Sequence, residues 1–106
     1  MSGRRRRGRG HAAGAKSTKG WARVKPTTDG ERRALKKRCG AAAFLDARRL
    51  KYPVVAAGAG CVPDCRGLRA AKSRASRFNR GLAAKAHRIA RRVGCRWAKE
   101  SFGVNR

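Results

Sequence analysis

Apolar residues recur at helical spacing in the C-terminal half of the chain. Steps of three, four and three residues separate Leu68, Ala71, Ala75 and Phe78, which predicts a helix over about residues 65–78 with one apolar face. Asp64, which follows Pro63, is a residue type that favours the N-cap position. The other faces of this helix are rich in arginine and lysine, so we expect them to be exposed.

A second apolar stripe follows after the helix-breaking residues 79–81. It predicts a helix over residues 82–93, ended by Gly94, with its apolar face formed by Leu82, Ala86, Ile89, Ala90 and Val93. The short connection favours an antiparallel helical hairpin, and the alanines allow close packing. We expect Trp97 and Phe102 to cover the end of this hairpin.

The pattern in the preceding segment is weaker. Thr28 and Glu31 form a capping-box motif that predicts a helix over residues 29–38, with Gly40 as its stop. Asp46 is suited to cap a short turn over 47–50, and Pro53 favours an extended conformation for Tyr52. The sequence thus predicts a mainly α domain over residues 28–106: a small helical hairpin with short extended segments.

Residues 1–27 have no periodic apolar face. They contain nine lysines and arginines, five glycines and no acidic residue, a composition that cannot form a core. We expect a long basic N-terminal arm that is disordered until it meets an anion, with Trp21 as its one large apolar contact.

Composition adds two constraints. The 106 residues contain 30 Lys+Arg against 5 Asp+Glu, a net charge of +25, which opposes compaction and favours a polyanionic partner. Twenty of the apolar residues are alanine, and only 16 larger ones follow Thr28. So small a core usually needs disulfides, a metal or a partner.

Four cysteines could supply that support. Two disulfides among Cys39, Cys61, Cys65 and Cys95 are the interpretation we favour, because each cysteine lies at the end of a predicted element. The sequence does not choose among the three possible pairings. A zinc site of these same four thiolates is an alternative, although CxxxC is not the usual knuckle spacing, and free buried thiols are another.

The acidic residues argue against catalysis. Asp29, Glu31, Asp46 and Asp64 all fall at predicted helix or turn starts, where they act as caps, and only Glu100 is left over. Since no nucleophile–base pair or phosphate loop is evident either, we expect no enzyme, no cofactor and no small-molecule substrate. No apolar run approaches the ~18 residues of a transmembrane helix, and no secretory signal is expected.

Two stretches, "RCGAAAFLDARRLKYPVV" and "CVPDCRGLRAAKSRA", resemble small basic proteins encoded by nucleocytoplasmic large DNA viruses, the giant-virus group. In that group a Cys-Gly, "FLD", "LKYPV", a cysteine pair and "GL.AAKSRA" recur over the equivalent of residues 38–97. The matching positions are Cys39, Gly40, Phe44, Leu45, Asp46, Leu50, Lys51, Tyr52, Pro53, Val54, Cys61, Cys65, Gly67, Leu68, Ala70, Ala71, Lys72, Ser73, Arg74 and Ala75. The resemblance implies a virion-associated, minor capsid protein, and a virus-encoded thiol oxidase would make disulfides reasonable there.

Two main functions follow as hypotheses, beside a zinc-dependent adaptor should the four cysteines bind the metal. The first is a minor capsid protein, located in the virion, that bridges or cements larger subunits by contacting their acidic surfaces. The alternative is a genome-condensing or ribosomal-type nucleic-acid-binding protein, located in the nucleus or ribosome, which the charge alone would favour. For either function we expect binding by Arg4, Arg5, Arg6, Arg7 and Arg9 in the arm and by Arg66, Arg69, Lys72, Arg74 and Arg77 on the helix.

Overall fold

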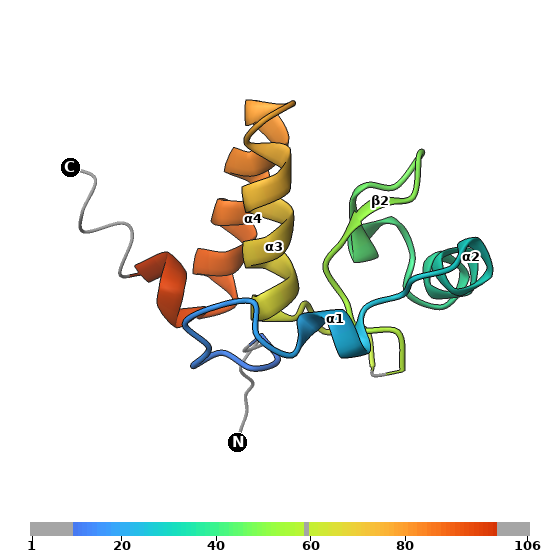
Figure 1. Cartoon of the computed structure of the whole chain (residues 1–106), viewed down its shortest axis with the longest axis horizontal. Coiled ribbons are helices and arrows are strands. Elements are labelled where there is room, and N and C mark those ends of the chain that lie inside the picture. The colour runs from blue at the N-terminus through green and yellow to red at the C-terminus, as the bar shows by residue number, and fades with distance from the viewer. Residues whose placement is uncertain (1–9, 59, 100–106) are drawn as a thin grey trace, which may run out of the picture.

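The computed structural model describes residues 10–58 and 60–99, and about half of these residues are helical. A hairpin of two helices forms one half of the molecule, and a two-stranded sheet separates it from a further helix (Figure 1). The expected mainly α fold is therefore confirmed in part, because the sheet is a second component.

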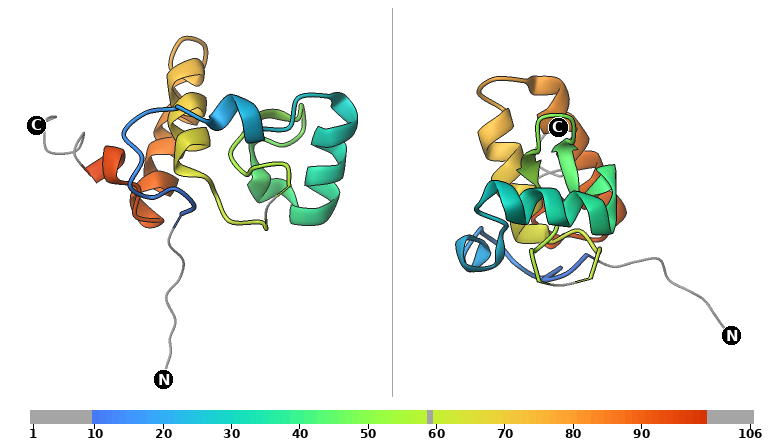
Figure 2. Two further views of the ribbon diagram at one scale, coloured as in Figure 1. Left: turned by 60° about the horizontal axis from the view of Figure 1, so that its bottom comes forward. Right: turned by 90° about the vertical axis from the view of Figure 1, so that its right-hand side faces the viewer.

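The predicted helical hairpin is present. α3 (Cys65–Ala75) and α4 (Arg80–Arg92) pack along each other and are joined by a short turn (Figures 1 and 2). Asp64 caps α3 by accepting hydrogen bonds from the backbone N–H groups of Arg66 and Gly67, and Asn79 caps α4 through Leu82 N–H. Leu68, Ala71, Ala86 and Ala90 are buried in the core shared with the other elements, and Ala75 is buried as well.

The prediction was wrong for one residue of the apolar face, Phe78. α3 ends at Ala75, three residues earlier than expected, and Phe78 is 78% exposed. Because the chain turns after Ala75, Phe78 no longer follows the helical repeat that places Leu68 and Ala71 inside. Trp97 is buried at the other end of the hairpin, as expected, whereas Phe102 lies outside the described residues.

The middle of the chain forms α2 (Asp29–Cys39), a single 3₁₀ turn η1 (Ala41–Ala43), and strands β1 (Phe44–Asp46) and β2 (Lys51–Pro53). α2 begins with the predicted capping box, in which Thr28 Oγ1 accepts from Glu31 N–H and the Glu31 carboxylate accepts from Thr28 N–H. The strands are antiparallel, with Phe44 opposite Pro53 and Asp46 opposite Lys51. The sequence did not predict β1.

The β-hairpin contains an unexpected backbone conformation. Leu50 and Tyr52 have φ values of 56° and 58°, in the left-handed region, so Tyr52 is not extended as its place before Pro53 suggested. A non-glycine residue in this region costs roughly 1–2 kcal/mol. The surrounding packing, with Leu50 and Tyr52 both against the buried core, must offset that cost.

The expected arm over residues 1–27 needs correction. Residues 10–27 pack on the domain: Gly10 N–H donates to Val93 O, Cys65 N–H donates to His11 O, and Arg96 N–H donates to Ala13 O. Further on, α1 (Trp21–Val24) buries Trp21 against α3. Backbone groups and one tryptophan make these contacts, so a composition without apolar periodicity did not reveal them. Residues 1–9, with the five expected arginines, lie outside the described residues.

Candidate anion-binding surface

The four cysteines form two disulfides, which confirms the favoured interpretation. Cys39 pairs with Cys61 and ties the end of α2 to the loop before α3, while Cys65 pairs with Cys95 and ties the start of α3 to the segment after α4. The second bond is fully buried, whereas Cys61 is exposed. All four sulfur atoms are thereby used, so the thiolates are not arranged as the alternative tetrathiolate zinc site. Among the residues that the structure describes, no cluster of three or more potential ligands could hold a metal.

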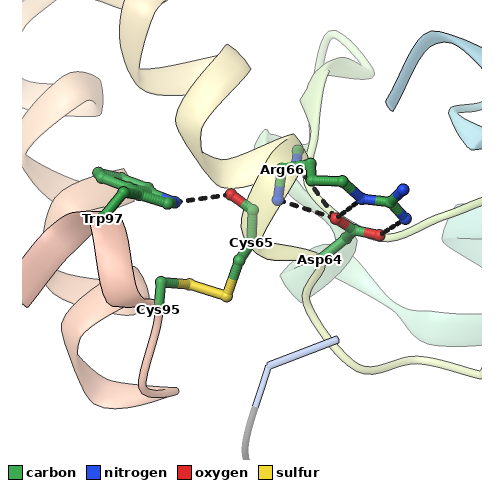
Figure 3. Close-up of polar contacts among 6 residues, drawn as sticks. Asp64, Cys65, Arg66, Cys95 and Trp97 are labelled. Atoms are coloured by element: carbon green, nitrogen blue, oxygen red, sulfur yellow. Dashed lines mark hydrogen bonds and ion pairs between the residues drawn. A yellow bond between two sulfur atoms is a disulfide. The ribbon is translucent and has the colours of Figure 1, made fainter. Parts of the chain in front are cut away.

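Arg66, the first cation of the expected binding face on α3, is held by an internal ion pair. Its Nε and Nη2 atoms donate to Asp64 Oδ1 and Oδ2 at 3.0 and 2.8 Å, and Asp64 is fully buried (Figure 3). The hydrogen bond to Asp64 raises the pKa of Arg66. Removing one partner of such a buried pair leaves an uncompensated charge, so Arg66 stabilises the start of α3 and is not free to bind a ligand.

Arg69 and Lys72 contact the aromatic end of the hairpin. The guanidinium carbon of Arg69 and Nζ of Lys72 lie 5.7 and 5.6 Å from the ring centroid of Trp97, within cation–π range. Trp97 itself donates from Nε1 to Cys65 O at 2.8 Å (Figure 3). Both cations thus interact with a ring that is fixed to the first turn of α3.

Lys72 also contacts His87. Its Nζ lies 3.0 Å from His87 Nδ1 on α4, a geometry in which the lysine donates and a neutral imidazole accepts. Burial, and then the charge of Arg69, lowers the pKa of Lys72, while burial followed by the charges of Lys72 and Arg91 lowers the pKa of His87. This cluster therefore favours a neutral histidine.

Arg74 and Arg77 are exposed near the end of α3. The five predicted cations thus do not form one continuous binding row. Three of them, Arg66, Arg69 and Lys72, already interact with groups of the domain itself. Lys72 lines one pocket with Arg88 of α4, and Arg74 joins cations from several other elements. It lines a pocket together with Lys25, Arg32 and Lys51, which the sequence did not single out. Positions 25, 32, 51 and 74 share no motif, so no sequence signal connects them.

The described carboxylates are all engaged within the chain. Asp29 lies 3.9 Å from Arg33, Asp46 accepts from Arg49 N–H, and Glu31 and Asp64 cap helices. Hydrogen bonds from Thr27, and then from Thr28 N–H, lower the pKa of Glu31. By contrast, 20 of the 24 described lysine and arginine side chains are exposed. The surface formed by the described residues consequently carries a large excess of positive charge, with little internal compensation.

Within residues 10–58 and 60–99, none of the helices has the length and apolar character needed to cross a membrane. Comparisons of the chain with protein-family models, with curated proteins and with solved structures gave no match.

Proposed function

We propose that this protein is a structural, non-catalytic component of an assembled particle, a minor capsid protein of a large DNA virus, which binds acidic surfaces of larger subunits. One observation carries the proposal. A small body closed by two disulfides exposes 20 of its 24 described lysines and arginines, while its described carboxylates are engaged in caps and ion pairs. We infer that an acidic partner supplies the compensating negative charge in the assembly.

The two disulfides support a structural role. They close loops with sequence separations of 22 and 30 residues and so restrict the unfolded chain. A body whose backbone is already rigid loses less conformational entropy when it binds. The resemblance of residues 38–97 to virion-associated proteins supports a virion as the setting for such a role.

The spacing of the cations favours a protein partner over a nucleic-acid backbone. Arg66, Arg69 and Lys72 interact within the domain, so α3 does not offer a row of free cations along a strand of phosphates. Both tryptophans are buried and Tyr52 is half-buried, which leaves no stacking platform among them.

A second candidate, nucleic-acid binding, is favoured by one feature. The turn between α3 and α4 exposes Phe78, with Arg77 and Arg80 close by in sequence. An exposed aromatic ring beside guanidinium groups is suited to stack on an unpaired base. A net charge of +25 would add a strong, salt-dependent attraction to any nucleic acid.

Cross-linking in purified particles separates the two candidates. A zero-length carbodiimide reagent would join exposed lysines such as Lys36, Lys37 and Lys85 to carboxylates within direct contact. We expect cross-links to aspartates and glutamates of larger capsid subunits, lost when the particles are first dissociated in high salt. Ultraviolet cross-links from Phe78 to nucleic acid, without carboxylate cross-links, would favour the second candidate. Purified particles that do not contain this protein would refute the capsid proposal.

A further inference from the structure

A pocket of about 300 Å³ lies where four elements of the chain meet. Trp21 and Lys25 come from α1 and the residue after it, Arg32 from α2, Tyr52 from β2, and Arg74 from α3. Figure 1 shows these elements gathered on the side of α3 away from α4. The remaining lining residues are Lys51, Pro53, Ala70 and Ala71.

The charged groups in this lining are all positive. Lys25, Arg32, Lys51 and Arg74 face it, and no aspartate or glutamate is among the lining residues. Four cations gathered around one concave site repel one another, and that repulsion is relieved by an anion bound between them.

Burial distinguishes two of these cations, Lys25 and Arg32, from most of the basic surface. Of the 24 described lysines and arginines, only four are half-buried: Lys25, Arg32, Arg66 and Lys72. Arg66 has Asp64 as its partner, and Lys72 has His87 and the Trp97 ring. Within the described part of the chain, neither Lys25 nor Arg32 has a carboxylate within ion-pair distance. Both of these remaining cations line the pocket.

One nitrogen atom of Arg32 provides a further observation. Its Nε is buried and has no hydrogen-bond partner among the described residues. Leaving a buried donor of a charged group unpaired is costly, and a ligand that draws the Arg32 guanidinium toward the pocket would bring this shielded donor to an acceptor. A guanidinium donates from Nε and Nη together in a fork that matches two oxygens of a phosphate or a carboxylate.

We propose that this pocket is a binding site for a phosphate group, held between Lys25, Arg32, Lys51 and Arg74. A phosphate carries up to two negative charges and presents oxygens in several directions, which suits cations arriving from four elements. A single carboxylate offers one charge and one plane of oxygens. This site goes beyond the proposed capsid role and does not depend on it.

The test follows the Arg32 Nε–Hε signal by NMR in the intact, oxidised chain while inorganic phosphate is added at about 0.15 M chloride. We expect a saturable shift of this signal, with smaller shifts at exposed arginines. Lys25→Gln should weaken the affinity about tenfold, the loss expected for one charge-assisted contact. Lys37→Gln is the matched control, because it removes the same charge from an exposed position of α2, and its affinity should stay within about twofold of the original.

Unsaturable shifts of similar size at all arginines would overturn the proposal, because they would indicate only screening of the overall charge. Equal losses in Lys25→Gln and Lys37→Gln would overturn it too. A glutamate-rich peptide that shifts Arg32 Hε at lower concentration than phosphate would assign the pocket to carboxylates instead. If phosphate binds, comparing inorganic phosphate with a 5′-phosphorylated oligonucleotide identifies which source of the group is preferred.

A stability measurement gives an independent answer. Arg32→Met keeps the length of the side chain and removes the unpaired donor, so Tm in phosphate-free buffer should rise by roughly 4–8 °C. Added phosphate should raise Tm of the original chain, as expected for a ligand of the folded state, and should raise Tm of Arg32→Met clearly less. An equal phosphate-induced rise in Arg32→Met and in the Arg33→Gln control would refute the site.

Discussion

Gly67 lies inside α3, where alanine would ordinarily be the better residue. Replacing glycine by alanine within a helix stabilises it by about 0.5–1 kcal/mol, because glycine loses more backbone freedom on folding. Here a Cβ atom at position 67 would lie 2.6, 2.7 and 2.9 Å from three ring carbons of Trp21. Carbon atoms at optimal contact are about 3.5–4.0 Å apart, so the ring would have to move by about 1 Å.

The clash outweighs the helix propensity. Trp21 is only 6% exposed and its planar ring has few ways to yield, so overpacking costs about 1–3 kcal/mol. Subtracting the propensity gain, we expect Gly67→Ala to reduce the free energy of unfolding by about 1–2 kcal/mol. Gly30→Ala in the first turn of α2 is the control. Its Cβ would meet no atom closer than Thr28 Oγ1 at 3.9 Å, so it should be neutral or stabilising by up to about 1 kcal/mol.

Denaturant unfolding of the oxidised chain, followed by far-ultraviolet circular dichroism, measures both variants. In a Trp21→Leu background the smaller side chain leaves space, and Gly67→Ala should there lose its penalty, a coupling that a double-mutant cycle quantifies. A Gly67→Ala variant as stable as Gly30→Ala would refute the close packing of α1 on α3. An unchanged penalty in the Trp21→Leu background would refute Trp21 as its cause.

Two further predictions concern the disulfides and pH. Loop closure makes each disulfide worth about 3.5 kcal/mol. Replacing the buried Cys65–Cys95 pair by alanines should cost about 1–2 kcal/mol more than replacing Cys39–Cys61, because it also leaves a cavity. Equal losses in denaturant unfolding would contradict this. Burial, and then Lys72 and Arg91, lowers the folded-state pKa of His87, so the unfolded chain binds this proton more readily. Stability should therefore fall as pH drops below the ordinary histidine pKa, and should level off below the folded-state pKa. His87→Gln should reduce this dependence between pH 7.5 and 5, and an unchanged pH profile would count against it.

The helices could be predicted because their signals are local. The Thr28–Glu31 capping box, the Asp64 cap and the spacing of Leu68, Ala71 and Ala75 each act within one or two helical turns, and all three appear as expected. Phe78 shows the limit of this reasoning. The apolar periodicity predicted that the helix reaches Phe78. The helix in fact ends three residues earlier and leaves the Phe78 ring exposed.

The candidate site could not be predicted, because it depends on contacts between residues that are far apart in the sequence. Sequence correctly marked Arg74 as an exposed cation, yet it gave Arg66 the same role, although a buried carboxylate two residues away holds that side chain. It could not group Lys25, Arg32 and Lys51 with Arg74, because they come from different elements. Spacing along a chain predicts which face of one helix a residue occupies, but it does not predict what packs against that face.

The sequence by itself therefore determined the helical hairpin, its caps, the excess of positive charge and the need for cross-links in a small core. Tertiary structure decided which cysteines pair, how residues 10–27 attach to the domain, and which cations remain without a partner. The physical reason is the range of the interactions. Caps and helical periodicity act over a few residues, whereas disulfides, backbone contacts between segments and pockets join residues that only the folded chain brings together.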